Sequence, residues 1–230
     1  MFARIKKWIP AFVVVPYLVT WIINMAAFYI GKLSPFQAIE IETAWDRALP
    51  FVPAFILIYV LAFVQWIVGY LIIMRDGRDT IRKVFPGEIL AKTIAFVIFF
   101  FMPTVMQRPE VTGHGLFDWL TRFIYFMDTP TCLFPSVHCL VSWICWRGTH
   151  YMKHVSKTYQ VCMFVFTLLV FAAVLLVKQH LIVDVLGGVA VAEIGLFLAP
   201  RLKLDRIFEA CCSAIEHRVK IRYQENEENS

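Results

Sequence analysis

The sequence predicts an all-α membrane protein, a bundle of six transmembrane helices with further helices at the membrane interface. One observation is composition: 60% of the 230 residues are hydrophobic and 17% are charged, unlike a soluble globular domain. The other is that six apolar runs approach the roughly 20 residues that a helix needs to cross a bilayer core of about 30 Å. These runs are Trp8–Ile30, Phe51–Met74, Ile89–Val105, Phe134–Trp146, Val161–Val177 and Leu181–Leu198.

Two of these runs need a separate argument. Met1–Lys7 followed by an apolar run resembles a secretory signal, but the run is too long and no small-x-small cleavage site follows it. We therefore expect a retained first helix. The fourth run reaches spanning length only if it extends from about Pro135 to Met152, through Arg147 and His150. Its far end is the least defined of the predicted boundaries.

Two segments outside the runs have patterns of their own. The loop Thr112–Thr131 contains GLFDWLTRFIYFM, a mostly apolar stretch with interspersed polar residues, which predicts a helix lying flat at the interface. That helix is either a passive anchor or a lid that admits a lipid tail. The chain after Pro200 becomes mixed and then acidic, which predicts a solvated helix with a disordered end. We expect one membrane domain, residues 1–200, and a cytoplasmic tail, residues 201–230.

The basic residues predict the orientation of the helices, because short cytoplasmic segments accumulate Lys and Arg. With six spans, the amino terminus, the loops after the second and fourth spans, and the tail share one side. Seventeen of the 22 Lys and Arg residues are assigned to that side, including Lys92 in the loop after the second span. We therefore expect a multi-pass plasma-membrane protein with both termini in the cytoplasm.

Three short stretches on the opposite, non-cytoplasmic side carry an unusual set of polar groups. MQRPEVTGHG, after the third run, contains Arg108, and FPSVHC, at the start of the fourth run, contains Ser136 and His138. VKQHLIVD joins the fifth and sixth runs. A six-helix bundle can bring these three stretches together at one membrane face.

His180 and Asp184 lie four residues apart, so their Cβ atoms are about 5–6 Å apart if the sixth helix begins near Leu181. A carboxylate beside an imidazole fixes its tautomer and stabilises its charged form, which leaves the other ring nitrogen free to act as a nucleophile. An ionised carboxylate inside a bilayer is costly unless paired, and is a functional candidate by default. The alternative is a polar pair that only joins two helices.

Arg108 and Lys178 are candidate phosphate ligands. They have no evident carboxylate partner on their own stretches except Glu110, which could pair with Arg108. A guanidinium and an ammonium suit phosphate oxygens and neutralise the charge that these oxygens carry during phosphoryl transfer. The two cations therefore predict an anionic phosphate ligand.

The Pro-Ser pair at the head of the fourth run predicts a helix start. Backbone N–H groups at Ser136, Val137 and His138 would point outward, toward an anion. His138, in that first turn, is placed to give a proton to a leaving oxygen as a general acid. A zinc site is a weak alternative, because no HExxH or paired CxxC occurs and only His114 or Asp118 could add a third ligand. We expect neither a metal nor another cofactor.

These stretches resemble the type 2 phosphatidic acid phosphatase superfamily of membrane lipid phosphatases and phosphotransferases. Its signatures are Lys-x6-Arg-Pro, Pro-Ser-x-His and Ser-Arg-x5-His-x3-Asp. Arg108–Pro109 match the end of the first, Pro135–His138 the second, and His180 with Asp184 the end of the third. The resemblance implies that His180 attacks phosphorus to form a phosphohistidine, that Asp184 holds His180, and that His138 protonates the leaving group. It implies no divalent metal.

The departures from the signatures point to a particular branch. The first-motif lysine would fall at Phe101 and the third-motif Ser-Arg at Ala173–Val174, and Lys178 is a candidate replacement for one lost charge. The altered signatures resemble those of the branch that includes fungal inositol phosphorylceramide synthases and their bacterial relatives. Because these signature residues are missing, an alternative is a catalytically inactive protein that only binds lipid phosphates, although His138 and His180 are intact.

The resemblance implies a lipid phosphatase that hydrolyses a lipid phosphate or an isoprenoid (pyro)phosphate at the outer face. The alternative is a phosphotransferase that moves a phospho-headgroup to a lipid or polyol hydroxyl. The expected partners are a lipid phosphate substrate and the bilayer, with no nucleic acid. The sequence predicts no oligomeric state.

Overall fold

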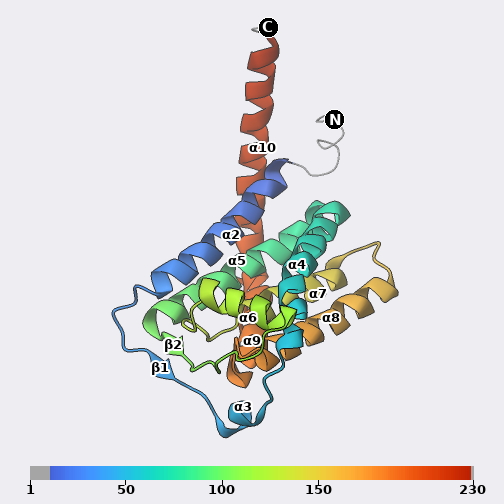
Figure 1. The fold of residues 1–230 in the computed structure, drawn as a ribbon. Coiled ribbons are helices and arrows are strands. Elements are labelled where there is room, and N and C mark those ends of the chain that lie inside the picture. Colours follow the sequence, from blue (N-terminus) through green and yellow to red (C-terminus); the bar gives the residue numbers. More distant parts are fainter. Residues whose placement is uncertain (1–10, 229–230) are drawn as a thin grey trace.

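The computed structural model describes residues 11–228, which fold almost entirely into helices (Figure 1). The prediction of an all-α fold is therefore confirmed. The strands β1 (Ile39–Glu40) and β2 (Thr104–Val105) pair in parallel, with Ile39 opposite Thr104. The helices are α2 (Ala11–Gly31), α3 (Ala44–Ala48), η1 (Pro53–Phe55), α4 (Ile56–Asp76), α5 (Arg78–Phe101), α6 (Leu116–Met127), α7 (Val137–Gly148), η2 (Thr149–Tyr151), α8 (Lys157–Leu176), α9 (Ile182–Arg201) and α10 (Leu204–Glu228).

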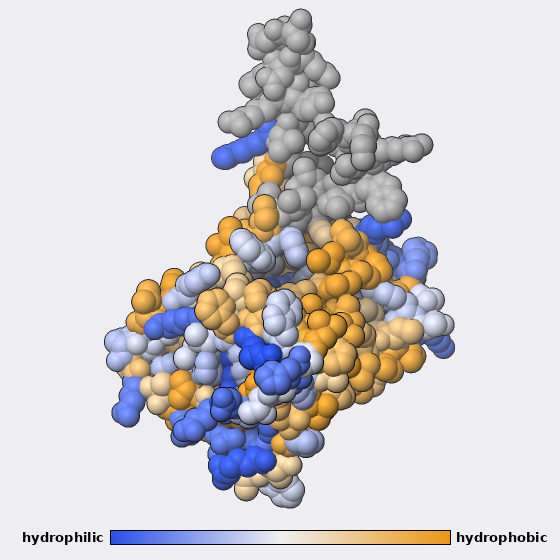
Figure 2. Space-filling model, in the orientation of Figure 1, coloured by the Kyte–Doolittle hydropathy of each residue, from blue (hydrophilic) through white to orange (hydrophobic). Residues whose placement is uncertain are grey.

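Four of the described helices are long and apolar enough to cross a membrane: η1 with α4, then α5, α8 and α9. Large apolar side chains such as Ile67, Leu186 and Phe197 are exposed on them, as expected for helices that face lipid. In Figure 2 apolar surface covers much of the helical body, while hydrophilic surface gathers near the end that holds β1 and α3. The structure is thus that of a protein with several helices suited to a bilayer.

The first and fourth predicted spans differ from this group. The first was expected from Trp8, but residues 1–10 lie outside the described part of the chain, and the apolar stretch described is Tyr17–Gly31. The fourth was expected to reach spanning length only if one helix extended to Met152, but α7 has 12 residues, about 18 Å at 1.5 Å per residue. It ends in the 3-10 turn η2. A topology of six spans stays a prediction.

The third predicted span begins earlier than expected. α5 starts at Arg78, directly after a turn at Gly77, rather than at Ile89. Gly77 has φ +124°, a left-handed conformation that favours glycine and lets the chain reverse between α4 and α5. Lys92 was assigned to a basic loop, but it is buried within α5, where its Nζ lies 2.7 Å from Glu88 Oε1. The assignment of Lys92 to the loop is therefore wrong.

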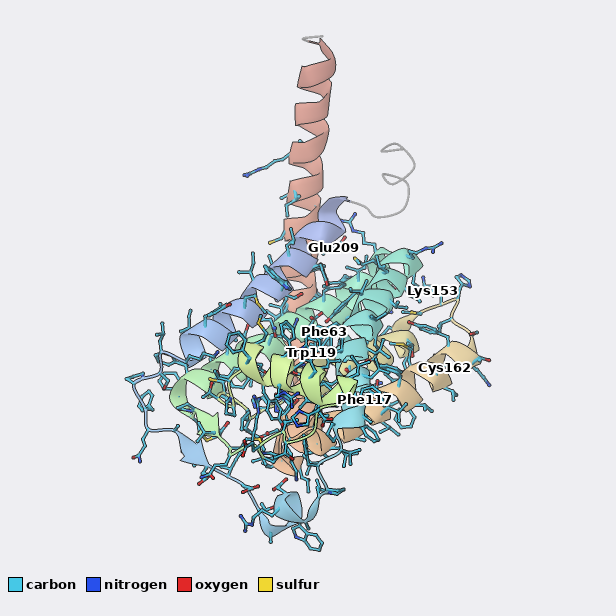
Figure 3. All side chains as sticks on the ribbon, viewed as in Figure 1. Phe63, Phe117, Trp119, Lys153, Cys162 and Glu209 are labelled. Carbon is cyan, nitrogen blue, oxygen red and sulfur yellow. The ribbon has the colours of Figure 1, made fainter. Side chains whose placement is uncertain are left out.

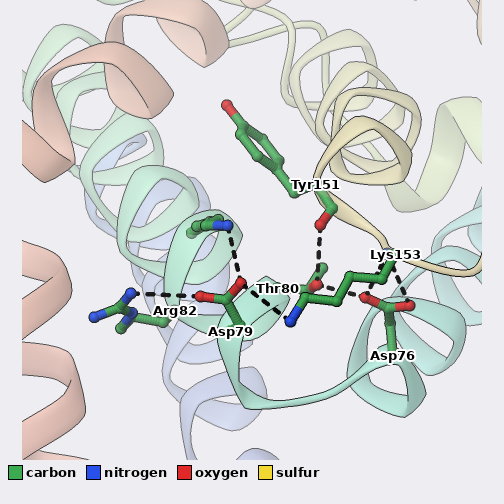
Figure 4. A network of polar contacts seen from close by, with 7 residues as sticks. Asp76, Asp79, Thr80, Arg82, Tyr151 and Lys153 are labelled. Carbon is green, nitrogen blue, oxygen red and sulfur yellow. Dashed lines mark hydrogen bonds and ion pairs between the residues drawn. The ribbon is translucent and has the colours of Figure 1, made fainter.

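Polar contacts join the α4–α5 turn, the α7–α8 loop and α10 at one end of the molecule, here called the α10 end. The Lys153 backbone N–H donates to Asp76, and Arg78 Nε lies 2.6 Å from Glu209 Oε1 (Figure 4 shows the Asp76 side of this network). Figure 3 places Lys153 and Glu209 toward this end and Phe117 of α6 toward the opposite one. The opposite end, with β1, β2 and α3, is called the loop end.

Glycines bring α9 close to its neighbours at Gly187, Gly188 and Gly195. A Cβ atom at Gly195 would lie 2.3 Å from the carbonyl oxygen of Gly87 on α5. A Cβ at Gly188 would lie 2.5 Å from the carbonyl oxygen of Ser136, at the start of α7. The absence of a side chain at these positions therefore sets how closely α9 packs against α5 and α7. The predicted domain boundary at residue 200 falls in the last turn of α9.

Candidate functional site

The three polar stretches meet at the loop end. The Arg108 guanidinium, from the first stretch, donates to Oε1 of Gln179 in the third. The Ser136 N–H, from the second stretch, donates to the Asp184 carbonyl of α9 at 3.0 Å. Thr104 Oγ1, beside the first stretch, accepts hydrogen bonds from Leu133 and Phe134 N–H at 2.9 Å each. Segments far apart in the chain are thus tied together by side-chain and backbone hydrogen bonds.

The two histidines lie beside each other at this end. His138 is in the first turn of α7 and His180 lies two residues before the start of α9, and their ring centroids are 5.7 Å apart. The backbone bond between Ser136 and Asp184 holds the two helix starts together. Both imidazoles line one cavity of about 390 Å³, called the first cavity. The structure therefore brings together the two rings that the sequence singled out.

Asp184 lies behind His180. Its Oδ2 atom is 3.4 Å from His180 Nδ1, within ion-pair range but longer than a hydrogen bond. The same Oδ2 accepts the Leu181 N–H at 2.8 Å, which caps the start of α9, and Oδ1 is buried without a partner. Asp184 thus has a structural role as a cap in addition to its contact with His180.

Aromatic residues of α4 surround His138. Its ring centroid lies 4.5 Å from that of Tyr59, 5.3 Å from that of Trp66 and 5.8 Å from that of Phe63. The rings restrict the orientation of the imidazole. His138 Nε2 is buried and has no hydrogen-bond partner. One nitrogen of this histidine is therefore available to a ligand.

Arg108 lies behind the wall of the first cavity rather than in it. Its guanidinium donates to the Asp128 carbonyl and to Gln179 Oε1, and it lies 4.6 Å from the centre of the Tyr125 ring. Burial lowers the pKa of Arg108, and the nearby Asp128 carboxyl opposes that shift. Arg108 is close to the histidines, but Gln179 lies between its charge and the cavity.

Lys178 does not line the first cavity. Its Nζ donates to the carbonyl oxygens of Asp46 and Leu49 at 2.7 Å each, and its own backbone has φ +51°. The Asp46 carboxylate in turn accepts the Ile182 N–H at 2.7 Å. Lys178 therefore ties the α8–α9 junction to the α3 region, whereas the sequence predicted that its ammonium would face a phosphate.

The start of α7 lies against the cavity through Val137 and His138, but the Ser136 N–H, which was predicted to face an anion, donates to the Asp184 carbonyl instead. Ser136 is fully buried, and its Oγ accepts the Cys139 N–H at 3.3 Å, so it is the N-cap of α7. Val137 lines the cavity. The first turn of α7 thus borders the cavity. Because a helix N-terminus carries unpaired N–H groups and positive potential, this space suits an anion.

Sequence reasoning missed most of the cavity wall, including the polar residues Gln179, Tyr59 and Asp128. Gln179 stood within VKQHLIVD, directly before His180, and that position was the only signal for it. Tyr59 lies within an apolar run and Asp128 directly follows the amphipathic stretch, so neither was singled out as a polar site residue; their side chains lie close together. Burial raises the pKa of Asp128, and the charges of Arg108 and His180 oppose that shift.

Within residues 11–228, no group of three or more His, Cys, Asp and Glu residues is arranged to hold a metal ion. In comparisons with known proteins, no protein-family model matches the sequence, and a search of curated proteins finds no match either.

Proposed function

We propose that the protein is a membrane lipid phosphatase of the type 2 phosphatidic acid phosphatase superfamily. It hydrolyses a lipid phosphate or an isoprenoid (pyro)phosphate through a phosphohistidine. The observation that carries this proposal is the pair of imidazoles of His138 and His180, 5.7 Å apart in one cavity, with Asp184 behind His180. Two imidazoles at this spacing can flank one phosphorus atom.

In the first step, Nε2 of His180 attacks phosphorus while the bond from phosphorus to the lipid oxygen breaks. His138, once protonated, gives its proton to that leaving oxygen. Asp184 accepts from Nδ1 of His180 and stabilises the positive charge on the phosphorylated ring. The alcohol leaves and the phosphoryl group stays on His180.

In the second step, water attacks the phosphorus and gives a proton to His138. The bond from phosphorus to His180 breaks, its electron pair returns to Nε2, and phosphate is released. The N-terminus of α7 stabilises the phosphoryl oxygens during both steps, and Arg108 acts on them through Gln179. Each residue thus ends in the protonation state in which it began.

We also propose the topology that this chemistry needs. The bundle has six spans, with α2 as the first and α7, extended by η2, as the fourth. The α10 end, which carries Lys153 and Arg78, faces the cytoplasm, and the loop end faces outward from the plasma membrane. The amphipathic helix α6 exposes Leu116, Trp119 and Phe126 and lies at the outer interface, where it acts as a lid over the first cavity.

Purified protein in detergent should release phosphate from phosphatidic acid in the presence of EDTA. His180→Ala should abolish the release, and His138→Ala should slow it at least a hundredfold, because general acids contribute about 10²–10⁴-fold. His150→Ala is the matched control, since His150 is an exposed histidine at the α10 end. Full phosphate release by the His180→Ala variant would refute the proposal.

Transfer of a phospho-headgroup to a lipid or polyol hydroxyl is the second candidate function, and a second cavity favours it. This cavity, of about 250 Å³, shares the wall residues Asn24, Phe63 and Trp66 with the first. It could hold an acceptor beside the phosphohistidine. Radiolabelled substrate distinguishes the two functions: hydrolysis yields free phosphate, and transfer yields a new phosphodiester.

A further inference from the structure

The first cavity lacks a direct cationic ligand for a phosphate. None of its described lining residues is a Lys or an Arg. Lys178 is bound to the Asp46 and Leu49 carbonyls, and Arg108 lies behind Gln179. A doubly charged phosphate monoester is ordinarily bound by cations that touch its oxygens. The first cavity offers neutral donors in that place.

Gln179 is the foremost of these donors. Its side chain is 1% exposed and lines the first cavity next to His180. Oε1 accepts from Arg108, and because the amide is planar, this bond also fixes the direction of Nε2. Nε2 is buried and has no partner. A buried donor without a partner is costly, so a ligand oxygen is the natural acceptor for it.

Arg108 makes this amide a stronger donor without adding a charge to the cavity. Its two terminal nitrogens donate to the Asp128 carbonyl and to Gln179 Oε1, and its Nε is buried without a partner. A guanidinium bound to an amide oxygen polarises the amide and strengthens its N–H groups as donors. Arg108 therefore acts on a ligand through Gln179, as a positioning residue.

Asp128 adds an acidic carboxyl near the neutral amide donor of Gln179. Asp128 lines the first cavity, and its carboxyl lies close enough to Tyr59 and His180 to interact with both. A carboxylate in the wall repels a ligand in proportion to that ligand's negative charge. A second negative charge on the phosphoryl group is therefore repelled more strongly by the Asp128 carboxylate than it is attracted by the neutral amide of Gln179.

We propose that Gln179 donates from Nε2 to a non-bridging phosphoryl oxygen and that Gln179 and Asp128 together select a phosphoryl group with one negative charge. The substrate is then either a phosphodiester or a monoester that retains one proton. The inference rests on the proposed function and names the substrate class of that site.

A matched pair of lipids tests the selectivity. Phosphatidic acid gains its second charge as the pH rises from 6 to 9, whereas phosphatidylmethanol with the same acyl chains keeps one charge. Formation of diacylglycerol measures the attack of His180 on both lipids. The ratio of their kcat/KM values cancels the titration of the free enzyme itself, because both substrates meet the same enzyme.

For the wild-type protein, we expect the ratio for phosphatidic acid over phosphatidylmethanol to fall about tenfold or more between pH 6 and pH 9. A ratio at pH 6 well above that at pH 9 identifies the protonated monoester as a substrate, and cleavage of phosphatidylmethanol at all pH values identifies the diester. A ratio that stays constant across this range would overturn the inference and leave the proposed function standing. Diacylglycerol from neither lipid would instead refute the proposed function.

Variants separate the two residues. Gln179→Met keeps the length of the side chain without a donor and should raise KM about tenfold for both lipids. Gln179→Lys and Asp128→Asn should each flatten the pH dependence of the ratio. Gln160→Met is the matched control, because Gln160 donates to the Thr149 carbonyl at the α10 end. Unchanged KM values for Gln179→Met, with a melting temperature equal to that of the control, would remove Gln179 from the site.

Discussion

Lys178 shows that a residue next to a candidate nucleophile can have a purely structural role. Its ammonium is held by two backbone carbonyls, of Asp46 and Leu49, at 2.7 Å each. A lysine in such a position links two loops by charge-assisted hydrogen bonds, which are stronger than bonds between neutral groups. The chemistry of its side chain was visible in the sequence, but its direction was not.

We therefore expect Lys178→Met to lower stability by about 1–3 kcal/mol and to change the KM for a lipid phosphate less than threefold. Thermal unfolding and initial rates at a temperature well below unfolding measure the two effects. Lys157→Met, at an exposed lysine of α8, is the control. A large rise in KM with unchanged stability would return Lys178 to the role of a phosphate ligand.

Asp128 should make stability depend on pH. Burial raises its pKa in the folded state above the unfolded value of about 3.9. The neutral form therefore favours folding at low pH, and that contribution is lost as the pH rises through the folded-state pKa. Asp128→Asn cannot ionise, so the variant should gain stability relative to the wild type between pH 4 and pH 8. Melting temperatures across this range measure the gain; a difference that shrinks as the pH rises would contradict it.

At the scale of elements, the contact of α9 with the start of α7 positions the two histidines. Gly188 faces the Ser136 carbonyl, which is backbone and cannot rotate away, whereas Gly187 faces the edge of the Phe134 ring. The Ser136 N–H bond to the Asp184 carbonyl crosses the same contact. Separation of the two helices at this point would therefore move His138 relative to His180.

Gly188→Ala should accordingly cost about 1–3 kcal/mol of stability, the usual cost of overpacking. It should also lower kcat at least tenfold, because a misplacement of about 1 Å in a site can cost 10²-fold. Gly187→Ala is the comparison: the Phe134 ring can shift, so a smaller effect on both quantities is expected. Unfolding and phosphate release are measured for both variants. Equal effects at the two positions would show that the Ser136 contact has no special role.

At the scale of the whole molecule, the distribution of charge predicts which end faces the cytoplasm. The α10 end gathers Arg75, Arg78, Arg82, Lys83 and Lys153, which the positive-inside rule places in the cytoplasm. The histidines of the candidate site lie at the other end. The proposed function therefore needs the loop end outside the cell.

Two exposed histidines provide a matched test of this orientation: His114 at the loop end and His154 at the α10 end. The exposed cysteines Cys162 and Cys211 are first replaced by serine. A membrane-impermeant maleimide should label His114→Cys in intact cells and His154→Cys only after permeabilisation. The reverse pattern would place the site on the cytoplasmic side and exclude an outer-face phosphatase.

The sequence by itself determined the features that depend on near neighbours in the chain. Apolar runs predicted α4, α8 and α9 closely, because length and hydropathy decide which helices suit a bilayer. The spacing of His180 and Asp184 predicted their contact, since residues four apart at a helix start lie on one face. The Pro-Ser pair predicted the start of α7.

Only the tertiary structure decided the features that depend on distant partners. Packing against other helices explains the early start of α5, the short α7 and the buried Lys92. The hydropathy pattern along the chain contains no information about that packing. The place of Gln179 between Arg108 and the cavity arises because Arg108, Asp128 and Gln179 come from three separate segments. Side-chain direction is set by such long-range contacts, so the chain predicted which chemical groups gather at the loop end, and packing decided which of them face the cavity.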